Sequence, residues 1–400
     1  MRRRAEIAVL VAVLVWAGAI VAAVRSEFDK GSANLSRAKP LPGKSCPGLV
    51  VGVDSSFGST DKPPGTAPSV AAIQKTLHAQ VVRVSLLWNQ VEPVKGTMQW
   101  GRLDSIVSEL RAAGIEPLLV VVGSPSWANG VPASKPGHDV YVPARGRPLD
   151  VWLQNYTSFL AAAVKRYDRF VRRWEIWTEP NVVGTWRPRP DPVAYRQVYE
   201  RLRAAILTRQ PNAQVAVGGL GDLTTAPRPD LSGIAFLRDL IRARTPIGNV
   251  AIHPSTTDGG PPDVHVAGRN NFGDIAQVHK LLVSNGVRAS LWVTGWGWSS
   301  TKVGSQRQEQ YVDRSLTLLE NSYPYVRLAT YVLDHDLPPS LFQGLLNARL
   351  QPKPAAFAFR VHADLAAVRC HEQMGTPAPS SPAPSTQTTS AIPSSMRVWR

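Results

Sequence analysis

Short apolar segments rich in Val, Ile and Leu alternate with longer amphipathic segments along most of this 400-residue chain, and this alternation constrains the fold most strongly. Apolar runs of this length are typical of buried parallel strands, which need a crossover helix between them. We predict strands at residues 49–54, 81–86, 116–122, 171–177, 213–219, 249–253, 289–294 and 327–333, with helices between them, for example at 70–80, 156–167, 195–207 and 308–320. Eight such units over roughly 320 residues predict a single (β/α)8 TIM barrel of the α/β class, with a doubly wound sheet as the alternative.

The two ends of the chain differ in composition from the predicted barrel. Residues 1–25 begin with three arginines and continue as an uncharged apolar run of 18 residues at 7–24, which is near the lower limit for spanning a bilayer. We predict an uncleaved membrane anchor with the barrel on the extracytoplasmic side, because the arginines favour the cytoplasm; a cleaved signal peptide, which would give a secreted protein, is the alternative. We predict a polar linker at 26–45, the barrel at 46–370, and a disordered tail rich in Pro, Ser and Thr at 371–400.

The chain is strongly basic, with a formal net charge of +16. No zinc-ligand spacing, Walker loop or RNA-binding signature accompanies this charge, so we expect no metal, no cofactor and no nucleic acid partner. The charge favours an anionic surface such as membrane lipid or an acidic envelope polymer. A general bias towards Arg is the alternative, because the charges are scattered through the sequence.

The sequence contains two cysteines, Cys46 and Cys370, and they bracket the predicted barrel. In an exported protein such a pair favours a disulfide over two buried thiols. In a closed barrel, the start of the first strand and the end of the last helix both lie at the N-terminal face. A disulfide there would join the first unit to the last.

Residues 174–181 read WEIWTEPN, and Glu179 follows the fourth predicted strand at the end where barrel enzymes place their catalytic groups. The segment resembles the end of strand four in retaining glycoside hydrolases of clan A, which include families 5 and 39. Further segments are similar to theirs in the same order: VRVSLLWNQVEPVKGTMQW from Val82, SPSWANG from Ser124, AIHPS from Ala251 and GLLNARLQPKPAAFAF from Gly344. The resemblance covers residues 48–368 and implies a glycosidase barrel.

Retaining hydrolysis uses two carboxyl groups, one as acid/base and one as nucleophile. The resemblance implies that Glu179 is the acid/base. The family ends strand seven with Thr-Glu and an aromatic residue, whereas this chain has Thr294, Gly295 and Trp296, so the nucleophile carboxylate is missing. Thr178 also replaces the asparagine that the family places before its acid/base.

The resemblance implies further differences around the missing carboxylate. Ser255 stands where relatives commonly have a tyrosine, and Arg83, which in relatives positions the nucleophile, is expected to lack its partner. Tryptophans near the strand ends, among them Trp177 and Trp186, are expected to stack against sugar rings, with packing as the alternative; Trp292 is expected in the core. The predicted carbohydrate-binding residues are Arg83, Trp88, Trp127, Thr178, Asn181, His253, Trp296 and Trp298.

We therefore predict a membrane-attached, extracytoplasmic barrel that binds an oligosaccharide or polysaccharide, such as a cell-envelope glycan, with conventional retaining hydrolysis lost or impaired. An active O-glycosyl hydrolase is the first alternative, with its base or nucleophile drawn from other acids after strands one, six and eight. A non-catalytic envelope scaffold is the second alternative. The candidate acids are Asp54, Asp258, Asp334 and Asp336.

Overall fold

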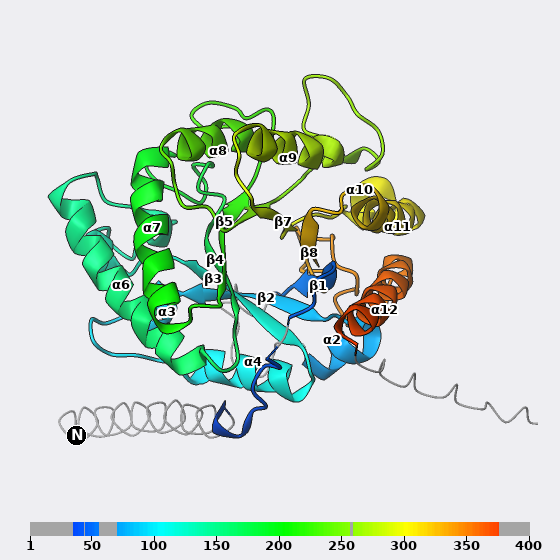
Figure 1. The fold of residues 1–400 in the computed structure, drawn as a ribbon, viewed down its shortest axis with the longest axis horizontal. Helices are drawn as coiled ribbons and strands as arrows, with labels where there is room; N and C mark the ends of the chain where they lie inside the picture. Colours follow the sequence, from blue (N-terminus) through cyan, green and yellow to red (C-terminus); the bar gives the residue numbers. More distant parts are fainter. Residues whose placement is uncertain (1–34, 44, 56–69, 257–258, 376–400) are drawn as a thin grey trace, which may run out of the picture.

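The computed structural model describes residues 35–43, 45–55, 70–256 and 259–375. Eight parallel strands form a closed barrel in chain order (Figure 1). The strands are β1 (Val50–Asp54), β2 (Val81–Leu87), β3 (Glu116–Val122), β4 (Arg173–Thr178), β5 (Gln214–Leu220), β6 (Asn249–Ile252), β7 (Ser290–Val293) and β8 (Val326–Tyr331).

Pairing between the first and last strands closes the barrel. β1 runs parallel to β8, with Val50 opposite Leu328 and Val53 opposite Tyr331. This closure confirms the predicted (β/α)8 barrel and excludes a doubly wound sheet, whose edge strands stay unpaired. All eight predicted strands are present within two residues of their expected ends.

Helices surround the barrel on its outer side (Figure 1). Helix α6 begins nine residues earlier than the sequence pattern predicted, because Leu149, Trp152 and Leu153 extend its buried stripe. The helices are α2 (Val70–Leu77), α3 (Trp88–Val91), α4 (Gly101–Ala112), α5 (Ser126–Asn129), η2 (His138–Val140), α6 (Arg147–Tyr167), α7 (Pro192–Arg209), α8 (Gly233–Arg242), η4 (Phe272–Asp274), α9 (Ile275–Ser284), α10 (Ser300–Val303), α11 (Ser305–Asn321) and α12 (Pro354–Met374).

The barrel has two apolar layers. A large shell lies between the outward faces of the strands and the helices. A smaller cluster contains buried residues from seven strands, and Trp292 is its largest member, as expected for a core residue. The members of this inner cluster are Val50, Val81, Leu118, Ala216, Ala251, Trp292 and Leu328.

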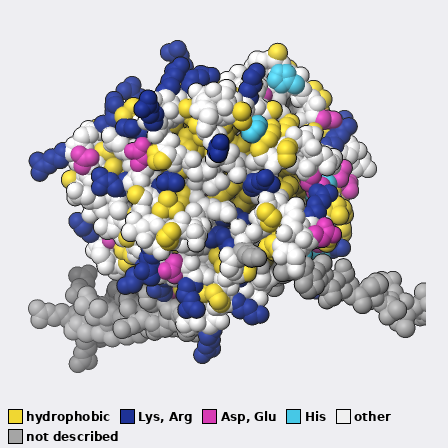
Figure 2. Space-filling view, viewed as in Figure 1, with side chains coloured by type: hydrophobic (Ala, Val, Ile, Leu, Met, Phe, Trp, Pro, Cys, Tyr) yellow, Lys and Arg dark blue, Asp and Glu magenta, His cyan; other side chains and the backbone are white. Residues whose placement is uncertain are grey.

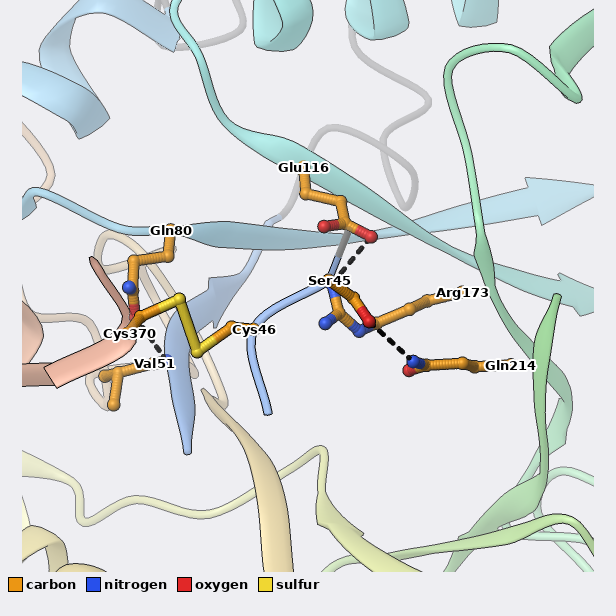
Figure 3. The surroundings of a disulfide bond; sticks show 8 residues. All are labelled: Ser45, Cys46, Val51, Gln80, Glu116, Arg173, Gln214 and Cys370. Carbon is orange, nitrogen blue, oxygen red and sulfur yellow. Dashed lines mark hydrogen bonds and ion pairs between the residues drawn. A yellow bond between two sulfur atoms is a disulfide. The ribbon is translucent and has the colours of Figure 1, made fainter. Parts of the chain in front are cut away.

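The predicted disulfide between Cys46 and Cys370 is present, with the two Cα atoms 5.3 Å apart. Cys46 precedes β1 and Cys370 lies near the end of α12, so the bond joins the first unit to the last (Figure 3). Beside it, Gln80 accepts a hydrogen bond from the Val51 amide at 2.9 Å. The bond therefore supports barrel closure at the N-terminal ends of the strands.

The described part of the predicted linker packs against the barrel. Leu35 is buried, and the guanidinium of Arg111 donates hydrogen bonds to the carbonyls of Lys39 and Pro40, both at 3.1 Å. Residues 35–43 of the predicted polar linker thus lie against the barrel, because a buried Arg side chain needs acceptors and this segment supplies them. Helix α12 also continues to Met374, past the expected end of the barrel.

The predicted membrane anchor at 1–25 lies outside the described residues, as does the tail from residue 376. Within the part of the chain that the structure describes, no helix is long and apolar enough to cross a membrane. Lys and Arg side chains are spread around the molecule in Figure 2 and do not form one patch in this view.

Candidate active site

A cavity of about 440 Å³ lies at the C-terminal ends of the strands, the end where TIM barrels carry their active sites. Asp54 at the end of β1, Arg83 from within β2, and residues that follow β4, β5, β6, β7 and β8 contribute to its wall. The lining residues are Asp54, Arg83, Thr178, Glu179, Val182, Gly221, Asp222, His253, Pro254, Ser255, Gly295, Trp296, Gly297, Val332 and Gln343.

Glu179 follows β4 directly and projects into this cavity. Its backbone is left-handed, with φ of +45°, and its amide donates to the carbonyl of Gly219 at 2.8 Å. This conformation is unfavourable for a glutamate and is characteristic of functional sites. One carboxylate oxygen, Oε1, accepts a hydrogen bond from Nδ1 of His253 at 2.8 Å.

The imidazole of His253 occupies the space beside Gly295. A Cβ atom at Gly295 would lie 2.9 Å from both Cγ and Cδ2 of His253, and one at Gly219 would lie 2.1 Å from its Nε2. Neither glycine has the positive φ that only glycine tolerates well, so the imidazole is the reason that side chains are excluded at both positions. A histidine therefore fills the volume into which a side chain at residue 295 would project.

Opposing influences act on the Glu179 carboxyl. Burial acts to raise its pKa, but the hydrogen bond from His253 and the positive charges of His253 and Arg83 outweigh burial, so its pKa is lowered. A general acid in a glycosidase needs a raised pKa in order to hold its proton at working pH. Glu179 is therefore set up as a carboxylate in this structure.

Arg83 does not lack a partner, contrary to the sequence-based expectation. Its guanidinium donates two hydrogen bonds to Glu175, at 3.0 and 2.8 Å, and a longer one to Thr178 at 3.3 Å. It also forms an ion pair with Asp54. Glu175 is absent from the predicted site residues, although it is the one acid inside the fourth strand and Arg83 the one base inside the second. A charge buried inside a barrel requires such a pairing.

The Asp54 carboxyl lies at the edge of the cavity, next to Arg83. Burial raises its pKa to about 6, although the charge and hydrogen bond of Arg83 oppose the shift; the negative charge of Glu175 adds to it. Among the acids proposed as alternatives, Asp54 is the one that the structure places in the cavity wall within the described residues.

The other alternative acids are engaged elsewhere or lie outside the described residues. Asp334 is fully buried and accepts hydrogen bonds from Ser55 and His335, and Asp336 pairs with Lys353 at 3.0 Å. Neither Asp334 nor Asp336 belongs to the cavity wall, so Asp334 is wrong as a candidate base. Both carboxylates instead bind neighbouring side chains. Asp258 lies outside the described residues.

Asp222 is a further cavity residue that the sequence analysis missed. It lies two residues past β5 and, like Glu179, has a left-handed backbone with φ of +43°. Burial raises its pKa, and the charges of Glu179 and Asp230 add to the effect. Its place just beyond a predicted strand was the signal that could have identified it.

Of the residues predicted to bind carbohydrate, Arg83, Thr178, His253 and Trp296 line the cavity, as does Ser255, whereas Asn181 does not. Asn181 is fully buried, donates to the carbonyls of Gly221 and Leu231 at 2.8 Å, and accepts from the Gly221 amide at 3.2 Å. It ties the loop after β4 to the loop after β5, and its amide is buried away from the cavity. The prediction of a binding role for Asn181 is therefore corrected to a structural one.

Most of the tryptophans expected to bind sugar are packed in the core. Trp88 is fully buried and stacks on Tyr156 with ring centroids 4.4 Å apart, and Trp298 is buried with its indole N–H bonded to Gly260. Trp127 is half-buried against Trp88 and is not among the cavity residues described. Trp177 and Trp186 are likewise buried. These tryptophans pack in the core because the helices at this end need large apolar side chains to cover the strand ends.

Solved structures of glycoside hydrolases resemble this barrel. A family 39 glycoside hydrolase from Bacteroides cellulosilyticus WH2 is 24% identical with a TM-score of 0.60, over 78% of this chain and 63% of its own. The family 39 enzyme from Xanthomonas axonopodis pv. citri is 22% identical with a TM-score of 0.58, over 82% of this chain and 68% of its own. The chain has the fold of clan A glycoside hydrolases.

A monomeric β-xylosidase from Caulobacter crescentus CB15 also matches, at 19% identity and a TM-score of 0.59, over 80% of this chain and 69% of its own. The chain thus spans 63% to 69% of the length of these three proteins. No family model and no curated protein matches the sequence. The likeness therefore establishes the fold, and activity has to be argued from the site.

Proposed function

We propose that this barrel binds a carbohydrate in the cavity around Glu179 and that conventional retaining hydrolysis there is impaired. The observation that carries the proposal is the imidazole of His253 packed against Gly295, the position that the resemblance equates with the nucleophile. A retaining glycosidase needs a carboxylate at that position to form its covalent intermediate. Here the position has no side chain, and a neighbouring residue fills the space.

The acid/base half of the reaction is also weakened. Glu179 accepts a hydrogen bond from His253 and has a lowered pKa, which opposes its use as a proton donor. The cavity nevertheless keeps the volume and the mixed polar and apolar lining that a sugar ring requires. Binding without efficient turnover is the function that best fits both features.

Isothermal titration calorimetry tests this proposal. The probes are xylotriose, because a β-xylosidase is among the similar structures, together with cellotriose and oligosaccharides released from cell envelopes. We expect at least one to bind the wild-type protein and to bind Ser255→Trp more weakly, because a large side chain at this exposed cavity residue fills the cavity. Absence of heat with every probe would favour the scaffold alternative. Turnover of p-nitrophenyl glycosides at rates typical of glycosidases would refute the impairment.

A second candidate is an O-glycosyl hydrolase that uses Asp54. A carboxyl whose pKa is raised to about 6 and that lines the cavity can act as a base close to neutral pH. In that case the wild-type protein hydrolyses glycosides and Asp54→Asn abolishes the reaction. Retention of full activity in Asp54→Asn would exclude this candidate.

We also propose that the apolar run at 7–24 places the barrel outside the cytoplasm, attached to the membrane. The basic charge would then bring the barrel close to acidic lipid or an acidic envelope polymer. Protease treatment of intact cells that express the full chain tests this location. Degradation of the barrel only after cell lysis would argue against it.

A further inference from the structure

His253 lies between three groups that the chain brings together from neighbouring strands. It follows β6, while Gly219 belongs to β5 and Gly295 follows β7. The ring contacts both glycines, and its Nδ1 bonds to Glu179 at the end of β4. Four consecutive units of the barrel thus meet at one imidazole.

One hydrogen bond holds the His253 ring in place. Nδ1 lies 2.8 Å from Oε1 of Glu179 and donates to this carboxylate oxygen. Nε2 is buried and has no hydrogen-bond partner among the described residues. The ring therefore packs beside Gly219 and Gly295 and donates a hydrogen bond to Glu179.

We propose that His253 is the residue that keeps this site inactive: its imidazole plugs the place of the nucleophile beside Gly295 and holds Glu179 as a hydrogen-bonded carboxylate. This inference deepens the proposed function and rests on it, because it assumes that a sugar enters the cavity. It attributes the loss of hydrolysis to the His253 side chain as well as to the missing nucleophile carboxylate. His253 acts through Glu179 and Gly295 and is therefore a positioning residue.

In a glycosidase that only lacks its nucleophile, a small anion such as azide can enter the vacant space and attack the anomeric carbon. Here the ring crowds the position beside Gly295, where a Cβ atom would lie 2.9 Å from its Cγ and Cδ2. Wild-type protein is therefore expected to resist rescue by azide, and removal of the imidazole is expected to permit it.

The rescued step balances without any further reagent. With 2,4-dinitrophenyl β-D-xyloside, an azide nitrogen forms a bond to C1 from the face opposite the leaving group. The bond between C1 and the phenolic oxygen breaks, and dinitrophenolate leaves with the electron pair. This leaving group needs no proton, so the state of Glu179 does not limit the step. The product is α-D-xylosyl azide, with inverted configuration.

The experiment compares His253→Ala with the wild-type protein and with His265→Ala, whose imidazole is 63% exposed and lies outside the cavity wall. Dinitrophenolate release is followed with and without azide, and the product is identified by NMR. We expect azide to accelerate His253→Ala by about 100-fold or more, the scale of a restored nucleophile, and to leave the other two proteins unchanged. His253→Asn, which keeps an amide donor for Glu179 in a smaller side chain, is expected to give intermediate rescue and covers the case in which the alanine variant does not fold.

Calorimetry with xylotriose separates the two proposals. Formation of α-xylosyl azide by wild-type protein as fast as by His253→Ala would overturn the plug. So would a folded His253→Ala that binds xylotriose but forms no azide product, and in that case the proposed carbohydrate binding would stand. Formation of β-xylosyl azide would also overturn it, because attack would then come from the side of Glu179. A wild-type protein and variants that bind no sugar and release no dinitrophenolate would refute the proposed function and the plug with it.

Discussion

Replacing Arg83 with methionine tests the buried ion pair between Arg83 and Glu175, which lies beside the cavity. The Glu175 side chain is fully buried and accepts hydrogen bonds from Arg83 at 3.0 and 2.8 Å, in addition to one from the Gly219 amide at 2.9 Å. Methionine fills a similar volume but removes both guanidinium bonds and leaves a buried carboxylate uncompensated. Breaking a buried ion pair from one side costs about 3–5 kcal/mol. We expect that loss in the free energy of unfolding, measured by urea denaturation at neutral pH.

Two controls make the result specific. Arg209→Met removes an ion pair whose arginine is 49% exposed, and it should cost less than about 1 kcal/mol. Arg83→Met combined with Glu175→Gln removes both charges and should be more stable than Arg83→Met alone. A loss below about 1 kcal/mol for Arg83→Met, or a double variant that loses the sum of the single effects, would refute the view that these charges depend on each other.

Three further predictions follow from the same structure. Serine at both Cys46 and Cys370 opens a loop of 324 residues and should lower the free energy of unfolding by about 5–6 kcal/mol; a double-serine variant as stable as the wild-type protein would contradict this. Gly219→Ala places a Cβ atom 2.1 Å from Nε2 of His253 and should lower the free energy of unfolding by about 1–3 kcal/mol in urea denaturation, so an unchanged midpoint would be a failure. The pKa of Asp54 is raised from 3.8 to about 6 by burial, so its contribution to stability is complete below its unfolded pKa and is lost as pH rises through about 6. Asp54→Asn should flatten the rise in urea midpoint that accompanies acidification over this range, and a profile parallel to that of the wild type would show that Asp54 is not responsible.

The architecture can be read from local sequence patterns. Strands of a closed parallel barrel are buried on both faces, so their apolar runs could be recognised without any knowledge of their neighbours. The same local signal placed Glu179 just beyond a strand end, and the positions of Cys46 and Cys370 at the two limits of the barrel predicted their disulfide. Each of these features depends on the order of elements along the chain, which the sequence contains directly.

Contacts between side chains of different strands depend on the folded barrel. Trp88 and Trp298 have the size and polarity for a sugar platform or for a core, and the helices packed over the strand ends made them core. The partner of Arg83 lies two strands away, and the imidazole that fills the space at Gly295 comes from β6. Such contacts depend on strand register and side-chain rotamers across neighbouring units, which no local pattern specifies. The missing carboxylate was visible in the sequence, whereas the histidine in its place became visible only in the folded barrel.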